Sequence, residues 1–478
     1  MAKIDTNRVD MPKQPPEARA RNFDEVALGY TPEMAASEAG RCLNCVKKNC
    51  VAGCPVGIDI PAFISALREK NIILASHVLK EKNALPGICG RVCPQETQCE
   101  ALCILGKKGA SVAIGRLERY VADWERNNPT AAQLVIPSFG GKRVAVVGSG
   151  PAGLTCAAEL AKLGHKVTLF EALHVAGGVL LYGIPEFRLP KAIVGGEVQY
   201  IAKLGVEIKL NSVIGKIDNV DELLSNGYDA VFLGTGAGLP LFLGVSGENL
   251  SGVYSANEFL TRVNLMKAYR FPEFDTPVKI GKKVMVIGGG NVAMDAARCA
   301  LRLGADEVSV VYRRSETEMP ARREEVENAK EEGIKFRFLT NPRSFIGDAK
   351  YQLTGMECQE MELGEPDASG RRRPIPKPGS EFILETDVAV VALGTTPNPL
   401  IAQTTAGLEV TRHGTVMADE ITGRTKKPGV WAGGDVVTGS ATVISAMGAA
   451  KRAATDMNAF LRLQGSNTSE TLDSTGGG

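Results

Sequence analysis

Two segments of this chain, which begin about 140 residues apart, repeat one pattern of strand, glycine-rich turn, helix and second strand. The first begins at Arg143 with RVAVVGSGPAGLTCAAELAKLGHKVTLFEA, and the second begins at Lys282 with KKVMVIGGGNVAMDAARCALRLGADEVSVVYRR. Parallel strands need a long crossover connection, which is usually a helix. The repeat therefore predicts an α/β protein with two Rossmann-like nucleotide-binding domains.

The first glycine turn has the residues that a dinucleotide site requires. Gly148 permits the tight turn, Gly150 lets the backbone approach a pyrophosphate, and Gly153 lets the helix pack against the strand. The free N–H groups at the start of the helix then face the phosphates. Glu171, 23 residues after Gly148, ends the second strand, where a carboxylate can accept ribose hydroxyls. The turn also contains Pro151 and Ala152.

Three further segments favour FAD over NAD at this first site. Gly177–Lys191 (GGVLLYGIPEFRLPK) has a glycine pair and an aromatic-flanked loop, which suit a flat isoalloxazine ring. Val231–Ala237 reads as a strand that ends in small residues. Asp435 follows a strand and faces a helix expected near Thr442, where it either binds a ribityl chain or only caps a helix. The residues expected at the flavin from these segments are Gly178, Arg188, Thr235, Gly236, Gly434 and Asp435.

The second glycine turn differs at the end of its second strand, where Tyr312-Arg313-Arg314 replaces the acidic residue. A carboxylate would repel a 2′-phosphate, whereas arginines bind it through charge-assisted contacts, so this site should prefer NADP(H). Alternatively, Arg313 and Arg314 are a surface pair, and Arg322 either helps them or only begins a helix. The remaining expected contacts in this turn are Gly288, Gly290, Asn291 and Val292.

Eight of the eleven cysteines lie between Cys42 and Cys103, in two closely spaced runs. Such spacing indicates iron–sulfur clusters, because one loop can supply several soft thiolate ligands. Zinc is the alternative, although only one Cys-x2-Cys unit is present, and disulfides fit a cytosolic enzyme poorly. The runs are Cys42, Cys45, Cys50 and Cys54, then Cys89, Cys93, Cys99 and Cys103. The other three thiols, Cys156, Cys299 and Cys358, are expected to be buried and inert.

The sequence divides into a cysteine-bearing N-terminal part and a larger nucleotide-binding part. We expect helices at Ile60–Lys70 and Ile114–Arg126, a linker from Asn127 to Gly141, and an exposed hairpin loop at Gly364–Ser380. The domains expected are 1–140 (helical, iron–sulfur), 141–250 (FAD, first part), 251–395 (NADP(H)), 396–463 (FAD, second part) and a disordered tail, 464–478.

The composition limits the possible partners and locations. The formal net charge is +1, so neither nucleic acid nor an anionic membrane is expected as a partner. No run of 18 apolar residues and no apolar signal region is present, so we expect a cytoplasmic protein.

From about residue 25 to 463 the chain resembles the small-subunit family of NADPH-dependent glutamate synthase. That family includes the large subunit of the electron-bifurcating NADH-dependent ferredoxin:NADP oxidoreductase, and the N-terminal half of dihydropyrimidine dehydrogenase is similar as well. The resemblance implies nucleotide domains of the glutathione-reductase type. It rests on GRCLNC, CPVGIDIPAFI, GICGRVCPQETQCEALC, IGRLERY, GGVLLYGIPEFRLPK, GGGNVAMD, YRRSETEMPAR and WAGGDVVTG.

The resemblance implies two [4Fe-4S] clusters whose ligands cross between the cysteine runs. By the family pattern, one cluster is held by Cys42, Cys45, Cys50 and Cys103, and the other by Cys54, Cys93, Cys99 and Glu118. Glu118 stands where relatives have Gln or Glu, but it can also be read as an exposed helix glutamate. Cys89 is then left without a ligand role, and an exchange with Cys93 stays open.

The resemblance also implies a function as one subunit of a hetero-oligomeric oxidoreductase. A hydride passes from NADPH to FAD, and electrons then pass singly through the Glu118 cluster and the Cys103 cluster to a partner. No catalytic side chain is required for hydride transfer. The partner is either a small flavoprotein with FAD and a [2Fe-2S] cluster, acting with ferredoxin, or the large glutamate synthase subunit. The N-terminal segment from Phe23 to Cys45 favours the first.

Overall fold

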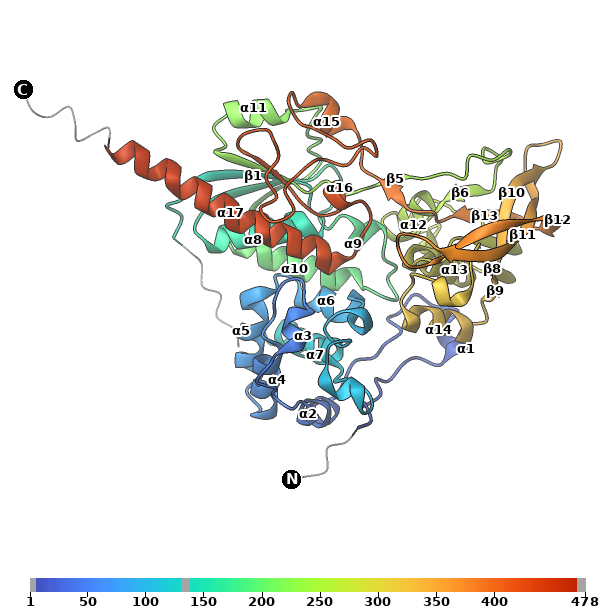
Figure 1. Ribbon diagram of the computed structural model, residues 1–478, viewed down its shortest axis with the longest axis horizontal. Helices are drawn as coiled ribbons and strands as arrows, with labels where there is room; N and C mark the ends of the chain where they lie inside the picture. Colours follow the sequence, from blue (N-terminus) through green and yellow to red (C-terminus); the bar gives the residue numbers. More distant parts are fainter. Residues whose placement is uncertain (1–5, 130–137, 471–478) are drawn as a thin grey trace, which may run out of the picture.

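The computed structural model describes residues 6–129 and 138–470, and for residues 464–470 it describes the backbone alone. A helical N-terminal part and two helix-covered parallel sheets make up most of the molecule (Figure 1). This arrangement confirms the predicted α/β class with a helical N-terminal domain. Within the described ranges, no helix is both long and apolar enough to cross a membrane.

The helical part consists of short helices joined by the loops that carry the cysteines. Side chains of Thr31, Asp59 and Asn71 each accept a backbone N–H from the first turn of the following helix. The helix from Ile60 ends two residues before the predicted Lys70, which has a left-handed φ of 57°. The helices are α1 (Pro16–Arg19), α2 (Pro32–Gly40), α3 (Asn49–Ala52), α4 (Ile60–Arg68), α5 (Ile72–Lys82), α6 (Pro86–Val92), η1 (Gln95–Thr97), η2 (Ile104–Lys107) and α7 (Ile114–Asn127).

The first sheet has five parallel strands in the order β15–β4–β1–β2–β3. Helices α8 and α17 pack against each other beside it (Figure 1). One continuous apolar core includes residues of this sheet, of both helices and of the helical part, so the two parts are joined by packing. The elements are β1 (Arg143–Val147), α8 (Pro151–Lys162), β2 (Lys166–Phe170), α9 (Val179–Tyr182), α10 (Lys191–Lys203), β3 (Glu207–Lys209), α11 (Val220–Ser225), β4 (Ala230–Leu233), α15 (Leu400–Thr404), β15 (Val430–Ala432), α16 (Asp435–Thr438) and α17 (Val443–Glu470).

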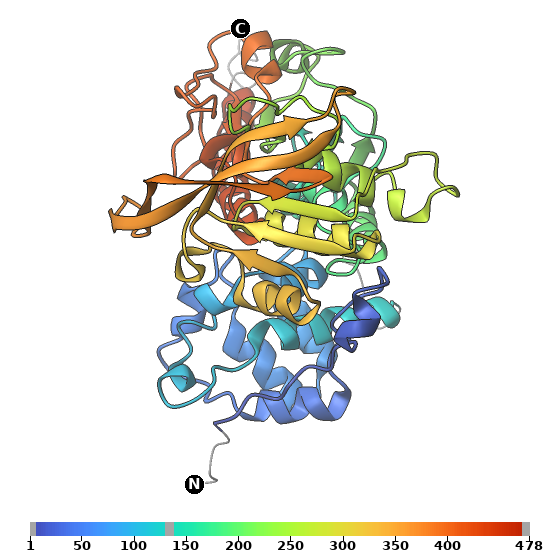
Figure 2. The same cartoon turned by 90° about the vertical axis from the view of Figure 1, so that its right-hand side faces the viewer.

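The second sheet is also parallel, with the order β6–β13–β7–β8–β9, and a three-stranded antiparallel sheet is attached to it. The hairpin of β11 and β12 extends away from the body of the molecule (Figure 2). The elements are β6 (Val253–Ser255), α12 (Ala256–Asn264), η3 (Ala268–Arg270), β7 (Lys283–Ile287), α13 (Asn291–Arg302), β8 (Glu307–Val311), η4 (Glu316–Glu318), α14 (Arg323–Glu331), β9 (Lys335–Arg337), β10 (Thr340–Gly347), β11 (Leu353–Pro366), β12 (Arg372–Glu385) and β13 (Val388–Val391).

The last strand of the first sheet, β15, follows the whole second sheet along the chain and pairs with β4. The chain passes between the two sheets twice, and the two passages pair as β5 (Leu239–Pro240) and β14 (Thr395–Thr396). The two nucleotide-binding units are therefore tied by two adjacent chain segments.

Three predicted segments differ from the structure in detail. The exposed hairpin is mostly paired strand, and only residues 367–371 form its loop. The predicted tail is wrong for residues 464–470, because α17 continues to Glu470. Extending an existing helix needs no new nucleus, so a small polar sequence can stay helical there. Residues 471–478 lie outside the described residues, as do residues 130–137 of the predicted linker, whose first residue, Asn127, ends α7.

Candidate functional site

The turn between β1 and α8 is built from glycines that leave no room for a side chain. Gly148 has a φ of +97°, and a Cβ added there would lie 2.5 Å from the Gly234 carbonyl oxygen. A Cβ at Gly153 would overlap the carbonyl oxygen of Gly148. At Gly150, by contrast, no atom lies within 4 Å of the Cβ position. The open space beside the first turn of α8 can therefore receive a phosphate group.

The segments predicted to hold the flavin meet at this same turn. A Cβ at Gly178 would lie 2.8 Å from the Gly150 Cα, and one at Gly434 would lie 2.9 Å from the Ala152 Cβ. The Thr235 Cα lies 3.1 Å from the Cβ position of Gly148. The predicted residues gathered here are Gly148, Gly150, Pro151, Ala152, Gly153, Gly178, Thr235, Gly236 and Gly434.

Two carboxylates lie beside the turn. Glu171 is buried at the end of β2, and its oxygens accept hydrogen bonds from the Ser149 N–H at 2.9 Å and the Leu173 N–H at 2.8 Å. Asp435 begins α16 and accepts from the Ala441 N–H at 3.2 Å. Burial raises the pKa of Asp435 to about 6. This contact fixes the loop that leads into α17, whereas the cap of α17 is Thr442, which accepts from the Ser445 N–H at 3.2 Å.

The second glycine turn, between β7 and α13, has the same first two glycines, and Ala293 stands in place of the third. Gly288 has a φ of +143°, and a Cβ there would overlap the Ala392 carbonyl oxygen. At Gly290 the nearest atom to the Cβ position is Pro320 Cγ at 3.9 Å, so the turn is open. Asn291 begins α13 and accepts a hydrogen bond from the Arg322 N–H at 2.9 Å, while Val292 is exposed.

The three arginines predicted to bind a 2′-phosphate lie in different surroundings. Arg313 is exposed just after β8. Arg314 is buried and pairs with Asp367, at the tip of the long hairpin, at 2.6 Å. Arg322 is buried and donates to Gln95 Oε1 at 3.0 Å, so it links the second nucleotide unit to the helical part. Of the three, only Arg313 extends into solvent.

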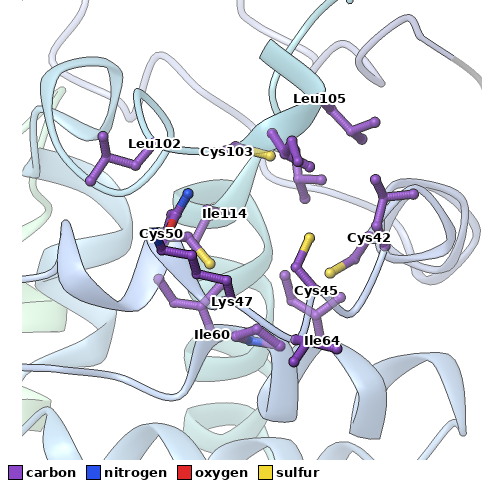
Figure 3. Close-up of a pocket in the computed structure, with 16 residues that line it drawn as sticks. Cys42, Cys45, Lys47, Cys50, Ile60, Ile64, Leu102, Cys103, Leu105 and Ile114 are labelled. Carbon is purple, nitrogen blue, oxygen red and sulfur yellow. The ribbon is translucent and has the colours of Figure 1, made fainter. Parts of the chain in front are cut away.

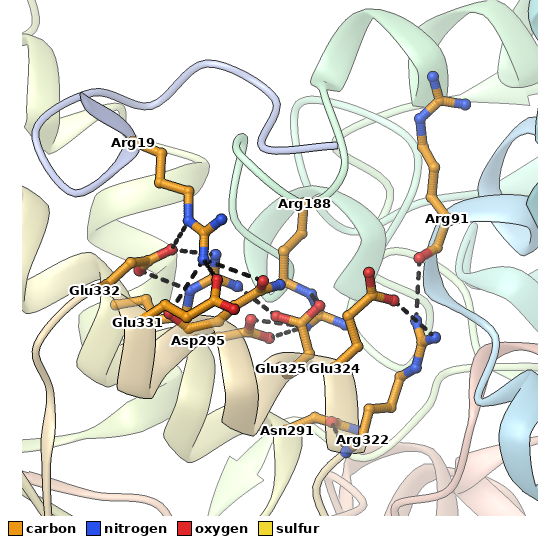
Figure 4. Close-up of polar contacts among 12 residues, drawn as sticks. Arg19, Arg91, Arg188, Asn291, Asp295, Arg322, Glu324, Glu325, Glu331 and Glu332 are labelled. Carbon is orange, nitrogen blue, oxygen red and sulfur yellow. Dashed lines mark hydrogen bonds and ion pairs between the residues drawn. The ribbon is translucent and has the colours of Figure 1, made fainter. Parts of the chain in front are cut away.

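Arg188, predicted to lie at the flavin, forms an ion pair between the two nucleotide units instead. Its side chain is 7% exposed and contacts Asp295 of α13 at 2.6 Å and Glu325 of α14 at 3.2 Å (Figure 4). These partners continue into a buried network with Arg298 and Glu332. The neighbouring carboxylates raise the pKa of Arg188 although burial opposes this, so it stays charged.

Four thiols of the helical part surround one cavity of about 330 Å³. Figure 3 shows the sulfurs of Cys42, Cys45, Cys50 and Cys103 around this space. Burial raises the pKa of Cys50 to about 11, and a bound cation would favour its thiolate. These four cysteines are the set that the family resemblance assigned to one cluster. The cavity has room for such a cluster. We call it the outer cavity, because all four cysteines are partly exposed.

A second, smaller cavity of about 20 Å³ lies deeper in the helical part. Its donors are Cys54, Cys93, Cys99 and Glu118, the set assigned to the other cluster, together with Cys89. Burial raises the pKa of Glu118 to about 8, opposed by a hydrogen bond from Asn83. A volume of this size holds about one water molecule, so these loops must separate to admit a cluster. We call it the inner cavity.

The outer cavity has the four thiols that a multi-iron cluster requires. In the part of the chain that the structure describes, no three His, Cys, Asp or Glu side chains group closely enough to hold one ion. The thiols of the outer cavity lie around one space, as the ligands of a multi-iron cluster do. The thiols of Cys156, Cys299 and Cys358 are buried, as predicted.

The inner cavity lies between the outer cavity and the helix that follows the flavin segments. Ile60 and Ile114 line both cavities and form the wall between them. On the other side, Ile444 of α17 lines the inner cavity. A Cβ at Gly448 of α17 would lie 2.7 Å from the Pro55 carbonyl oxygen, so this helix packs directly on the cysteine loop.

Comparison with known proteins identifies both parts of the chain. Residues 19–130 match the family described as dihydropyrimidine dehydrogenase domain II, 4Fe-4S cluster, and residues 142–451 match pyridine nucleotide-disulphide oxidoreductase. The fold and the site thus define an iron–sulfur flavoprotein oxidoreductase that uses NADP(H).

Similar proteins make the family more specific. The small chain of NADPH glutamate synthase from Escherichia coli is 37% identical over 463 residues, which cover 94% of this chain and 96% of that one. The NADP(+)-dependent formate dehydrogenase subunit beta of Moorella thermoacetica is 41% identical, and the match spans 89% of this chain but only 61% of that protein. The chain belongs to the family of the glutamate synthase small chain, and both of these relatives are named as subunits.

A solved structure supports the fold of the nucleotide-binding part. FprA of Mycobacterium tuberculosis in complex with NADPH superimposes with a TM-score of 0.57 at 22% identity, over 69% of this chain and 86% of that one. The likeness is one of fold alone.

Sequence reasoning missed several residues that connect the parts. Asn83 contacts Glu118, Gln95 contacts Arg322, and Asp295 contacts Arg188. Asp295 ends the segment GGGNVAMD and Arg188 lies in GGVLLYGIPEFRLPK, so both stood in noted motifs. Their opposite charges were the available signal. Asn83 and Gln95 are neutral and lie outside any spacing rule, so no signal pointed to them.

Proposed function

We propose that this protein takes electrons from NADPH and delivers them singly to a partner subunit by way of two [4Fe-4S] clusters. The observation that carries the proposal is the order in which the sites follow one another. The flavin segments come first, then α17, then the inner cavity, and last the outer cavity at the surface. Ile444 of α17 lines the inner cavity, and Ile60 and Ile114 lie between the two cavities. When bound, FAD supplies the exchange between a two-electron hydride and single electrons.

In this proposal the chain's own residues hold and separate the cofactors. The glycine turn at Gly148–Gly153 binds the FAD pyrophosphate, and the turn at Gly288–Ala293 binds that of NADPH. Cys42, Cys45, Cys50 and Cys103 hold the outer cluster, and Cys54, Cys93, Cys99 and Glu118 hold the inner one. The apolar wall of Ile60 and Ile114 excludes water between them.

For the partner we propose two candidates. The first is the small flavoprotein of an electron-bifurcating transhydrogenase, with FAD, a [2Fe-2S] cluster and ferredoxin as a further acceptor. The exposed lysines Lys47, Lys107 and Lys108 near the outer cavity suit an acidic electron carrier of this kind. The second is a large glutamate synthase subunit, favoured by relatives named as the small chain of that enzyme, which match over nearly their full length.

Native mass spectrometry of the complex isolated anaerobically from its own cells distinguishes the two candidates. A small companion carrying flavin and a [2Fe-2S] cluster supports the transhydrogenase. A large companion, with NADPH oxidation that depends on glutamine and 2-oxoglutarate, supports glutamate synthase instead. Isolation of the chain with no companion contradicts both.

Replacing Cys45 by alanine tests the outer cluster. We expect C45A to lose half of the bound iron and acid-labile sulfide. The substitution removes a ligand of the outer cluster and leaves the ligands of the inner cluster in place. NADPH should still reduce the flavin within about twofold of the wild-type rate, since the flavin segments are untouched, whereas electron delivery to the partner should stop. C358A removes a buried thiol of the second unit and should lose no iron. Loss of all the iron, or of none, would contradict two clusters.

Replacing Arg313 by alanine tests the preference for NADP(H). A hydrogen bond to a charged group contributes about 1.5–3 kcal/mol. We therefore expect R313A to lower the ratio of kcat/KM for NADPH to that for NADH by about tenfold or more. Flavin reduction under anaerobic conditions measures both values. The exposed Arg373 on β12 gives the control R373A, which removes the same charge and should leave the ratio unchanged.

A further inference from the structure

Asn83 is a fully buried side chain between α5 and the inner cavity. It follows the last residue of α5, and its backbone N–H donates to the Leu79 carbonyl at 2.8 Å. Its side-chain oxygen accepts a hydrogen bond from the Leu85 N–H at 2.9 Å. Its side-chain nitrogen donates to Glu118 Oε1 at 2.7 Å. The oxygen also accepts from the Cys89 thiol, whose Sγ lies 3.8 Å away. The oxygen end of the amide therefore faces donors, and the nitrogen end faces Glu118.

The hydrogen bonds fix which way the amide of Asn83 points. The Leu85 N–H is a donor and can be met only by the amide oxygen. The NH₂ group must then face Glu118, where it meets one carboxylate oxygen. Among the described residues, Glu118 Oε2 makes no hydrogen bond, and the side chain lines the inner cavity. One oxygen is thus held by Asn83 while the other is free to bind iron.

We propose that Asn83 is a positioning residue, which orients Glu118 as the fourth ligand of the inner cluster and raises that cluster's reduction potential. The inference rests on the proposed function, since it requires a cluster in the inner cavity. A donor to a ligand oxygen withdraws negative charge from the ligand and so stabilises the reduced, more negative cluster. Any side-chain oxygen at this position could accept the Leu85 N–H. The NH₂ group of Asn83 serves only the hydrogen bond to Glu118.

Two substitutions separate the capping role from the positioning role. N83D has the same shape and keeps the oxygen that caps Leu85, but it replaces the donor to Glu118 and adds a negative charge there. N83S also keeps an oxygen that can meet Leu85 and cannot reach Glu118. The matched control is N71D, at the other end of α5, where the Asn71 side chain is exposed and caps the Leu74 N–H at 3.0 Å. N71D keeps that cap and touches neither cavity.

The experiment is a redox titration of the anaerobically purified holoprotein, followed by electron paramagnetic resonance, with iron and sulfide content measured alongside. We expect N83D and N83S to lower the midpoint potential of one cluster by the equivalent of about tenfold in its reduction equilibrium, or about 59 mV for one electron. The other cluster and N71D should keep wild-type potentials. E118Q should shift the same cluster upward, because its ligand loses a negative charge. The shift in midpoint potential that N83S causes should then be smaller in the E118Q background than in the wild-type background.

The outcomes separate this inference from the proposed function. A shift in E118Q with none in N83D and N83S overturns the positioning role alone. A shift in N83S that is equally large in the E118Q background also overturns it, because Asn83 would then act independently of Glu118. Unchanged potentials in E118Q overturn the ligand assignment together with the positioning role.

Discussion

Replacing Gly153 by alanine is expected to abolish flavin retention. A Cβ at this position would overlap the Gly148 carbonyl oxygen, which is backbone and cannot move aside as a side-chain end can. The start of α8 would have to separate from β1, and the turn would lose its shape. Overpacking costs about 1–3 kcal/mol and occasionally more, and a backbone neighbour places this case at the upper end. The loss of bound FAD would remove its stabilisation as well.

The matched control is Gly195→Ala in α10, where no atom lies within 4 Å of the Cβ position. G195A should keep its flavin and gain up to about 1 kcal/mol, because alanine is the better helix former. Flavin absorbance per protein and thermal unfolding measure both variants. Full flavin content in G153A would contradict the assignment of this turn to the pyrophosphate. Flavin loss in both variants would mean that the assay reports general instability.

The sequence predicted the fold and the two glycine turns because their signals are local. A run of apolar residues, a glycine at a fixed offset and a following helix are all contained in about 30 residues. The crossing of ligands between the two cysteine runs is not local. The family resemblance supplied it, and the structure gathers the same two sets around two cavities, while ligation itself stays a prediction.

Contacts between the parts of the molecule could not be predicted in this way. Arg188 stood in a flavin segment and was assigned to the flavin, but it pairs with Asp295 of the second unit. Arg322 was considered for the nucleotide and instead contacts Gln95 of the helical part. A charged residue in a motif has the same local signal whether it binds a cofactor or a neighbouring domain. Only the packing of the parts decides between the two.

Replacing Glu332 by glutamine is expected to destabilise the second nucleotide unit by about 3–5 kcal/mol, as is typical when one partner of a buried ion pair is removed. Its side chain is 0% exposed and pairs with Arg298 and Arg302 at 2.7 Å and with Arg19 of the N-terminal arm at 2.9 Å (Figure 4). Burial opposes its charge, but the hydrogen bonds and charges of Arg298 and Arg302 lower the pKa of Glu332 to about 2. A lowered pKa contributes stability that is present above the ordinary value of 4.5, so the full effect applies at neutral pH.

Hydrogen exchange followed by mass spectrometry is the suitable measurement, because both tryptophans, Trp124 and Trp431, lie outside the second sheet. In E332Q, amides of α13 and α14 should exchange roughly a hundredfold to several thousandfold faster, since each 1.4 kcal/mol corresponds to about tenfold. Amides near Arg19 should lose protection with them, because that side chain loses its buried partner. The control E316Q removes an exposed ion pair between Glu316 of η4 and Lys330 of α14 and should change exchange little. Equal, small effects in both variants would show that the buried network contributes no more than a surface pair, and that the N-terminal arm is held to α14 by other contacts.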